Sequence, residues 1–132
     1  MSYKERTQNK GFFVMGPIEV ILDRQNSFQP DFIYVAEERM GIIKDNIYGA
    51  PDLVIEILCP SNAYYDLRQK KDIYQKYGVK EYIIIDPIAQ NADLYLLKEG
   101  AYYLNQQAQK TEVLNSVLLP GLRFDLNKIF NF

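Results

Sequence analysis

The sequence predicts a single α/β or α+β domain, built as one mixed β-sheet with at least one packed helix. The chain has 132 residues, close to the commonest size of one domain. Hydrophobic residues make up 48% of it, which is enough to fill one core. Two apolar, β-branched runs flank a segment of helical periodicity, an order typical of a strand–helix–strand unit. We therefore expect one domain over residues 1–132, with the polar residues 1–11 flexible.

The first half of the chain predicts three strands. Residues 11–17 form a lead punctuated by glycine and proline, and a strand is expected at about 18–23. The second strand spans 31–36, and a longer loop rich in glycine and polar residues follows over 37–51. The third strand, 52–58, is the most apolar of the set. The proline on each side of it favours a strand over a helix.

The second half begins with a predicted helix over residues 60–78. Ser61 or Asn62 can cap its start, and a glycine can end it. Residues 81–86 form another buried strand, so the strand, helix and strand predict a right-handed parallel crossover. The remaining expectations are a hairpin that turns at 98–100 and, over 112–130, a short strand, a Pro-Gly turn and a terminal segment.

Composition excludes several kinds of chemistry. The chain has no histidine and one cysteine, which removes His-based triads, His-ligated zinc and disulfides. A metal, if used, would be an oxygen-bound ion such as Mg or Mn. The net charge of -2 gives no support for nucleic-acid binding from bulk charge. Because no apolar run approaches ~18 residues and the polar start lacks a signal-peptide core, we expect a cytoplasmic protein without a membrane span.

Glu56 lies in the middle of the most apolar strand. A buried carboxylate without a partner costs several kcal/mol, so Glu56 needs a lysine, an arginine or a metal. A metal requires a second carboxylate. Asp31 is the first choice, because antiparallel pairing of strands 32–35 and 53–58 would bring it close to Glu56. Asp52 is the second choice: it shares a strand face with Glu56 but is about 13 Å away along the strand. An aspartate after proline is also usually a solvated turn residue.

Lys70 is the second charge in an unexpected place. On a helical wheel it falls near the middle of an apolar stripe made by Leu67, Ile73, Tyr74 and Tyr77. One interpretation is that Lys70 extends along the helix to reach water. The other is that it points into a polar pocket and meets Glu56. Asp66, four residues earlier, could then hold the lysine in place.

Four segments in order resemble the Uma-two family, a group of restriction-endonuclease-like proteins abundant in cyanobacteria. They are "QPDFIYV", "PDLVIEILCPSN", "DLRQKKDIYQKYGVKEYIIIDP" and "LLPGLRFDL", and the resemblance runs from about Phe12 to Phe130. It implies the PD-(D/E)XK nuclease fold, a central mixed sheet flanked by helices. Family members usually have one or two helices before the first strand, and we expect that element to be short or missing here.

The resemblance also implies a site. Asp31 matches the acid of the first motif and Glu56 that of the second, and these acids hold a divalent metal in the superfamily. The usual lysine would stand at position 58, which is leucine here. Lys70 on the following helix takes that place, and Asp52 and Asp66 are supporting candidates.

The function implied is metal-dependent hydrolysis of DNA, with Mg or Mn as cofactor and DNA as partner. The alternative is a catalytically inactive relative that acts as a binding or regulatory module. A third interpretation is a general α/β protein with a structural Glu56–Lys70 pair. A homodimer is expected, because a missing helix would leave apolar sheet surface uncovered.

Overall fold

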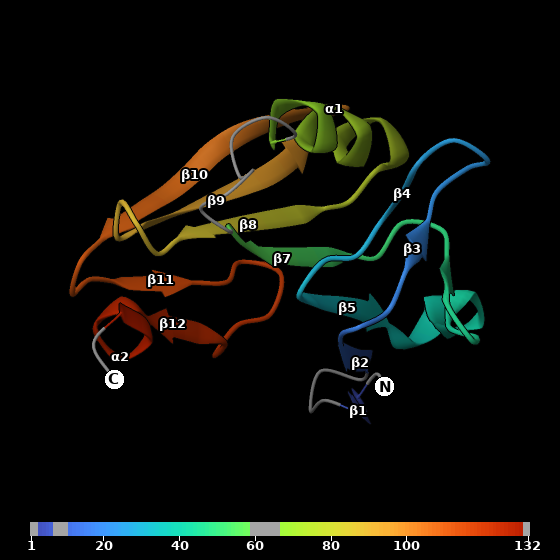
Figure 1. The fold of residues 1–132 in the computed structure, drawn as a ribbon, viewed down its shortest axis with the longest axis horizontal. Coiled ribbons are helices and arrows are strands. Elements are labelled where there is room, and N and C mark those ends of the chain that lie inside the picture. Colours follow the sequence, from blue (N-terminus) through green and yellow to red (C-terminus); the bar gives the residue numbers. More distant parts are fainter. Residues whose placement is uncertain (1–2, 7–10, 59–66, 131–132) are drawn as a thin grey trace.

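A seven-stranded mixed sheet forms the centre of the computed structural model, which describes residues 3–6, 11–58 and 67–130. Its strand order is β1-β2-β5-β7-β8-β9-β10 (Figure 1). The strands span β1 (Tyr3–Arg6), β2 (Gly11–Met15), β5 (Phe32–Ala36), β7 (Leu53–Ile57), β8 (Glu81–Asp86), β9 (Asn91–Lys98) and β10 (Ala101–Gln109).

The middle of the sheet is the predicted crossover. β7 and β8 pair in parallel, and helix α1 (Leu67–Tyr77) lies between them in the chain. The other neighbouring strands of this sheet are antiparallel. Gly78 follows the helix with a φ of 87°, a conformation that favours glycine at a helix end. The predicted caps Ser61 and Asn62 lie outside the described residues.

Each face of the sheet is covered by a different layer (Figure 1). Alternating side chains of the central strands point to opposite faces. Val54, Tyr82 and Ile84 join one apolar cluster, to which Tyr74 of α1 also belongs. The opposite cluster contains the interior side chains of the same strands and, from the C-terminal segment, Leu114 and Leu126. This segment consists of β11 (Val113–Asn115), β12 (Arg123–Asp125) and α2 (Leu126–Phe130).

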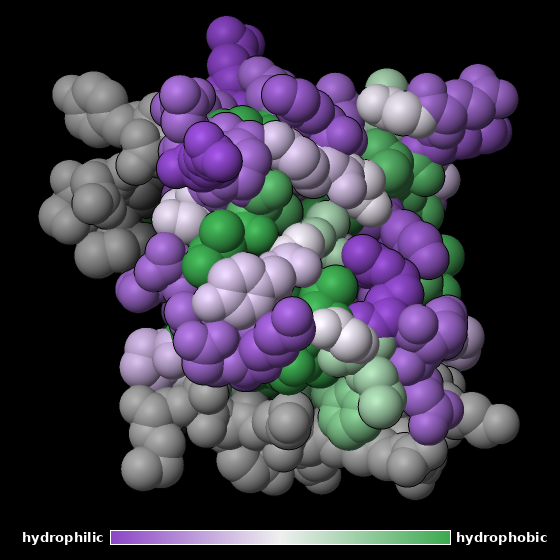
Figure 2. Space-filling view, turned by 90° about the vertical axis from the view of Figure 1, so that its right-hand side faces the viewer, coloured by the Kyte–Doolittle hydropathy of each residue, from purple (hydrophilic) through white to green (hydrophobic). Residues whose placement is uncertain are grey.

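A small sheet packs beside the main one. It contains β3 (Val20–Ile21), β4 (Ser27–Phe28) and β6 (Ile47–Tyr48), and a 3-10 helix, η1 (Glu37–Ile42), lies between β5 and β6 in the chain. Figure 2 views the molecule from the side on which β3, β4 and η1 lie in Figure 1, and it shows hydrophilic residues around smaller apolar patches. The hydroxyl of Tyr77 donates to the carboxylate of Asp23, which ties the β3–β4 turn to the end of α1.

Two sequence-based expectations for the first half need correction. The lead at 11–17 contains β2, which pairs with β1 and β5 inside the main sheet. The strand expected at 18–23 is only the two-residue β3. The hairpin prediction is confirmed: Glu99 and Gly100 link β9 to β10 with positive φ angles of 52° and 81°, as a two-residue hairpin turn requires. None of the described helices is long and apolar enough to cross a membrane.

Candidate active site

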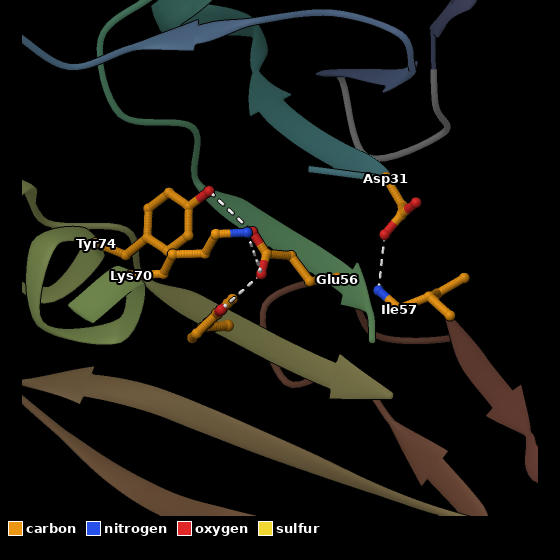
Figure 3. Close-up of polar contacts among 6 residues, drawn as sticks. Asp31, Glu56, Ile57, Lys70 and Tyr74 are labelled. Carbon is orange, nitrogen blue, oxygen red and sulfur yellow. Dashed lines mark hydrogen bonds and ion pairs between the residues drawn. The ribbon is translucent and has the colours of Figure 1, made fainter. Parts of the chain in front are cut away.

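Glu56 is held inside the layer between the sheet and α1. It is 5% exposed although it lies near the end of β7. Its Oε1 accepts a hydrogen bond from the hydroxyl of Tyr74 at 3.1 Å, and its Oε2 accepts one from Tyr82 at 3.0 Å (Figure 3). Both oxygens of Glu56 therefore have a hydrogen-bond donor, as a buried carboxylate requires.

Lys70 supplies the positive charge beside this carboxylate. Its Nζ lies 3.7 Å from Oε2 of Glu56, and the side chain of the lysine is 29% exposed. The same ammonium lies 5.7 Å from the ring centroid of Phe28. Lys70 therefore points toward Glu56, as one of the two sequence interpretations required, while part of it stays open to solvent. The third charge of that interpretation, Asp66, lies outside the described residues.

Asp31 directly precedes β5, the strand next to the one that carries Glu56. Phe32 pairs with Ile55, so the register continued by one residue sets Asp31 opposite Glu56. Opposite residues of an antiparallel pair are about 5 Å apart at their Cα atoms. The carboxylate itself turns to the backbone, since its Oδ2 accepts a hydrogen bond of 2.7 Å from the N–H of Ile57. In Figure 3 the carboxylates of Asp31 and Glu56 point in different directions.

A surface cavity opens beside Asp31. Its volume is about 450 Å³, and it is lined by Asp31, by the residue pairs Gly16–Pro17 and Gln29–Pro30, and by apolar residues that include Phe32 and Ile57. Asp31 is exposed to solvent, in contrast to Glu56. A ligand could thus approach Asp31 from this side.

Asp52 has a role that the sequence did not predict. It was the second candidate for a metal ligand, with a solvated turn residue as the alternative, and it is only 1% exposed. Its Oδ2 accepts a hydrogen bond of 2.8 Å from the N–H of Ala36. Its Oδ1 lies 3.3 Å from both Arg39 and Lys80, within ion-pair range but without a hydrogen bond among the described residues. Asp52 directly precedes β7 and Glu56 lies near the other end of that strand, and Asp52 has cations of its own.

Two further buried carboxylates have structural partners in loops. Glu81 is fully buried and accepts hydrogen bonds from the hydroxyl of Ser116 and from the N–H groups of Val117 and Leu118. Asp86 accepts hydrogen bonds from the N–H groups two and three residues ahead of it, which is typical of an Asx turn. The hydrogen bonds found for Glu56 among the described residues all come from side chains, whereas Glu81 and Asp86 also accept from backbone N–H groups. Burial alone therefore does not identify a functional carboxylate, whereas the set of partners separates Glu56 from the others.

Tyr74 and Tyr82 are the site residues that sequence reasoning missed. Both are fully buried, and their rings meet edge to face with centroids 5.1 Å apart. Burial, and next the negative charge of Glu56, raises the pKa of each hydroxyl far above its usual value. Both groups therefore remain hydrogen-bond donors at neutral pH. The sequence could have pointed to these two residues, because both lie at predicted core positions and a buried tyrosine hydroxyl usually needs a hydrogen-bond partner.

The residue types suit a hard divalent cation. A magnesium ion takes oxygen ligands and needs only one or two protein carboxylates, because water and substrate phosphate complete its shell. Asp31 and Glu56 supply two carboxylates on paired strands. Within the described residues, no group of three or more Asp, Glu, Cys or His side chains gathers in a way that could hold an ion. The site therefore offers two ligands at most from the described side chains.

Comparison with solved structures shows which fold this chain has. The fold is that of a crystal structure described as "a putative nuclease belonging to DUF820" from Anabaena variabilis. The similarity has a TM-score of 0.73 and 18% sequence identity, and it covers 93% of this chain and 69% of that one. The predicted fold, a restriction-endonuclease-like mixed sheet flanked by helices, is thus confirmed.

The family follows from the sequence match. Residues 1–127 match the Uma2 family, which is described as "Putative restriction endonuclease", and the chain belongs to this family. The resemblance noted in the sequence is confirmed by this match. A comparison with the curated proteins found no match. Proteins of the restriction-endonuclease-like class generally use divalent metals and act on nucleic acids.

Proposed function

We propose that this chain is a metal-dependent endonuclease that hydrolyses phosphodiester bonds of DNA, with Asp31, Glu56 and Lys70 as its catalytic residues. The observation that carries the proposal is the 3.7 Å ion pair between Lys70 and Glu56. Each is a charge placed among apolar neighbours, and two separate elements, α1 and β7, bring them together. A pairing of this kind, in a chain of a nuclease family, supports a catalytic role for the two residues.

Each residue has a distinct part in this proposal. Asp31 and Glu56 would hold Mg or Mn, and such an ion, when bound, supplies an activated water and neutralises phosphate charge. The ammonium of Lys70 is partly exposed, so it can contact a phosphate oxygen while it stays near Glu56. There it would stabilise the charge that develops in the transition state. Phosphoryl transfer by these groups needs no histidine, in agreement with the composition.

The direct test is cleavage of supercoiled plasmid by the purified chain. We expect nicked and linear products in the presence of Mg or Mn, and no cleavage when EDTA removes the ion. Product formation at an equal rate in EDTA would contradict the metal-dependent mechanism. The absence of cleavage with either ion, on both single-stranded and duplex DNA, would contradict the enzymatic proposal itself.

The second candidate is an inactive relative that binds DNA without cutting it. One observation favours it: both oxygens of Glu56 already contact donors from Tyr74, Tyr82 and Lys70. The two candidates differ in a gel-shift experiment run beside the cleavage assay. A retarded complex that leaves the plasmid intact in Mg and in Mn supports the inactive module.

We also propose that the chain forms a homodimer. On the sheet face opposite α1, an apolar groove of about 360 Å³ remains open, and Ile57 within it is 41% exposed. A second copy that covers this groove would remove it from water. Light scattering on a size-exclusion column should give twice the mass of one chain. The variant Ile57→Glu should give the mass of a monomer, whereas the same change at the 68% exposed Ile88 should leave the dimer intact.

A further inference from the structure

Three donors from two elements enclose the carboxylate of Glu56. Tyr74 and Lys70 stand one turn apart on α1, and Tyr82 belongs to β8, the parallel neighbour of the strand that carries Glu56. Oε1 accepts one hydroxyl, and Oε2 accepts the other hydroxyl and faces the ammonium. Figure 3 shows this carboxylate turned toward α1.

The two tyrosines are rigid partners. Neither ring has measurable exposure, and Phe28 meets Tyr74 edge to face at 5.3 Å. Close packing on several sides leaves little freedom for the rings to follow a moving carboxylate. If Glu56 turns away, at least one buried hydroxyl loses its acceptor, and an unsatisfied buried polar group is costly.

Asp31 marks the direction in which Glu56 would have to turn. The strand register sets the two residues opposite each other, yet the carboxylate of Asp31 is bonded to the N–H of Ile57, on the other side of Glu56 from the tyrosines (Figure 3). In this arrangement the two carboxylates do not converge on one point. A shared ion therefore competes with the tyrosine hydroxyls for Glu56.

We propose that Tyr74 and Tyr82 are positioning residues that hold Glu56 in a closed arrangement against α1, and that a divalent ion binds only when Glu56 leaves at least one of their hydroxyls. This inference rests on the proposed function, because it takes Glu56 and Asp31 as the ligands of that ion. It assigns the two tyrosines a specific effect: they set the concentration at which the ion binds. The closed form is then the resting state of the site.

Binding of Mn to the full-length chain tests this inference without any measurement of cleavage. Free Mn is followed by its electron paramagnetic resonance signal in the wild type, Tyr74→Phe, Tyr82→Phe and the double variant. Each phenylalanine keeps the ring and removes one competing hydroxyl, so each single variant should bind Mn about five-fold more tightly. The double variant should gain on the order of twenty-fold.

Tyr102→Phe is the matched control. Its hydroxyl also donates a part-buried hydrogen bond, but the acceptor is the carbonyl oxygen of Val79 at 2.7 Å. No contact of this hydroxyl with Glu56 is found among the described residues. Its Mn affinity should equal that of the wild type. Melting curves of all variants show whether each is folded, and Asp31→Asn in each background shows whether the bound Mn is at this site.

The outcomes separate the inference from the proposed function. Asp31-dependent binding that is unchanged or weaker in both tyrosine variants overturns the closed arrangement and leaves the metal site in place. Mn affinity that is unchanged by Asp31→Asn in every background, or no Mn binding at all, overturns both the inference and the proposed metal site. Binding that appears only in the tyrosine variants supports the inference, since it shows the hydroxyls to be what excludes the ion.

Discussion

Glu56→Gln should lower the rate of plasmid cleavage by about 10³-fold or more, which corresponds to roughly 4 kcal/mol in the activation free energy. The glutamine has almost the same shape and keeps one oxygen that a tyrosine hydroxyl can reach. It removes the negative charge, which both an ion and Lys70 require. The rate of nicking at saturating Mg, measured on protein with a checked melting curve, gives the result.

Lys70→Met should lower the same rate by about 10² to 10³-fold, since it removes a cation placed to stabilise transition-state charge. Methionine approximates the length of the lysine stem and keeps its packing along α1. The neighbouring Lys71→Met is the control. Its ammonium lies 3.9 Å from the ring centroid of Tyr95, and no ion pair with Glu56 is found for it among the described residues. Cleavage that survives both Glu56→Gln and Lys70→Met would rule out this site.

Replacement of Asp31 should affect cleavage and melting temperature differently from replacement of Glu56. It is exposed, and its bond to Ile57 can be made by an asparagine oxygen as well. Asp31→Asn should therefore abolish cleavage with little change in the melting temperature. Loss of stability in parallel with activity would instead indicate that Asp31 serves the fold.

The pairing of Glu56 with Lys70 could be predicted because the burial of each side chain follows from the repeat of its secondary-structure element. Alternation along an apolar strand buries Glu56, and the helical repeat puts Lys70 on the stripe that contains Tyr74. These two patterns, joined by a parallel crossover, place both side chains in one layer. The antiparallel approach of Asp31 also followed, because a loop of sufficient length separates two predicted strands.

The partners of the other polar groups could not be predicted, because they come from distant segments. Periodicity shows that Tyr82 is buried but not that its hydroxyl, 26 residues away from Glu56 in the chain, reaches that carboxylate. Asp52 follows proline as solvated turn residues do. Its burial depends on Arg39 and Lys80, which no local pattern connects with it. The hydrophobic periodicity of a sequence predicts which face of a helix or strand a side chain lies on, whereas its hydrogen-bond partners depend on the whole topology.

Glu81 is the strongest case of such a distant partner, and its replacement should have the largest effect on stability. Its two oxygens accept hydrogen bonds from Ser116 at 2.6 Å and from the N–H groups of Val117 and Leu118 at 2.9 Å each. The Ser116 hydroxyl also accepts the N–H of Leu119 at 3.0 Å, so the carboxylate organises the whole turn after β11. This turn carries the apolar Leu119 into the core opposite α1.

Glu81→Ala removes a fully buried acceptor and leaves three donors without it, of which the N–H groups of Val117 and Leu118 are only part-buried. Each unsatisfied group costs about 1 to 3 kcal/mol, and entry of water offsets part of the sum. We expect the free energy of unfolding to fall by about 3 kcal/mol, with a drop in melting temperature on the order of 10 °C. Urea unfolding followed by tyrosine fluorescence measures the change.

Glu112→Ala is the matched control for this change. Its carboxylate also accepts a hydrogen bond from a backbone N–H, that of Gln109 at 2.7 Å, but in an exposed position where water can replace it. Its loss should cost less than about 1 kcal/mol. Glu81→Gln should fall between the two, since the amide oxygen keeps an acceptor for some of the donors, while the amide nitrogen cannot accept the others. Equal stability of Glu81→Ala and Glu112→Ala would show that the turn after β11 does not depend on the buried carboxylate.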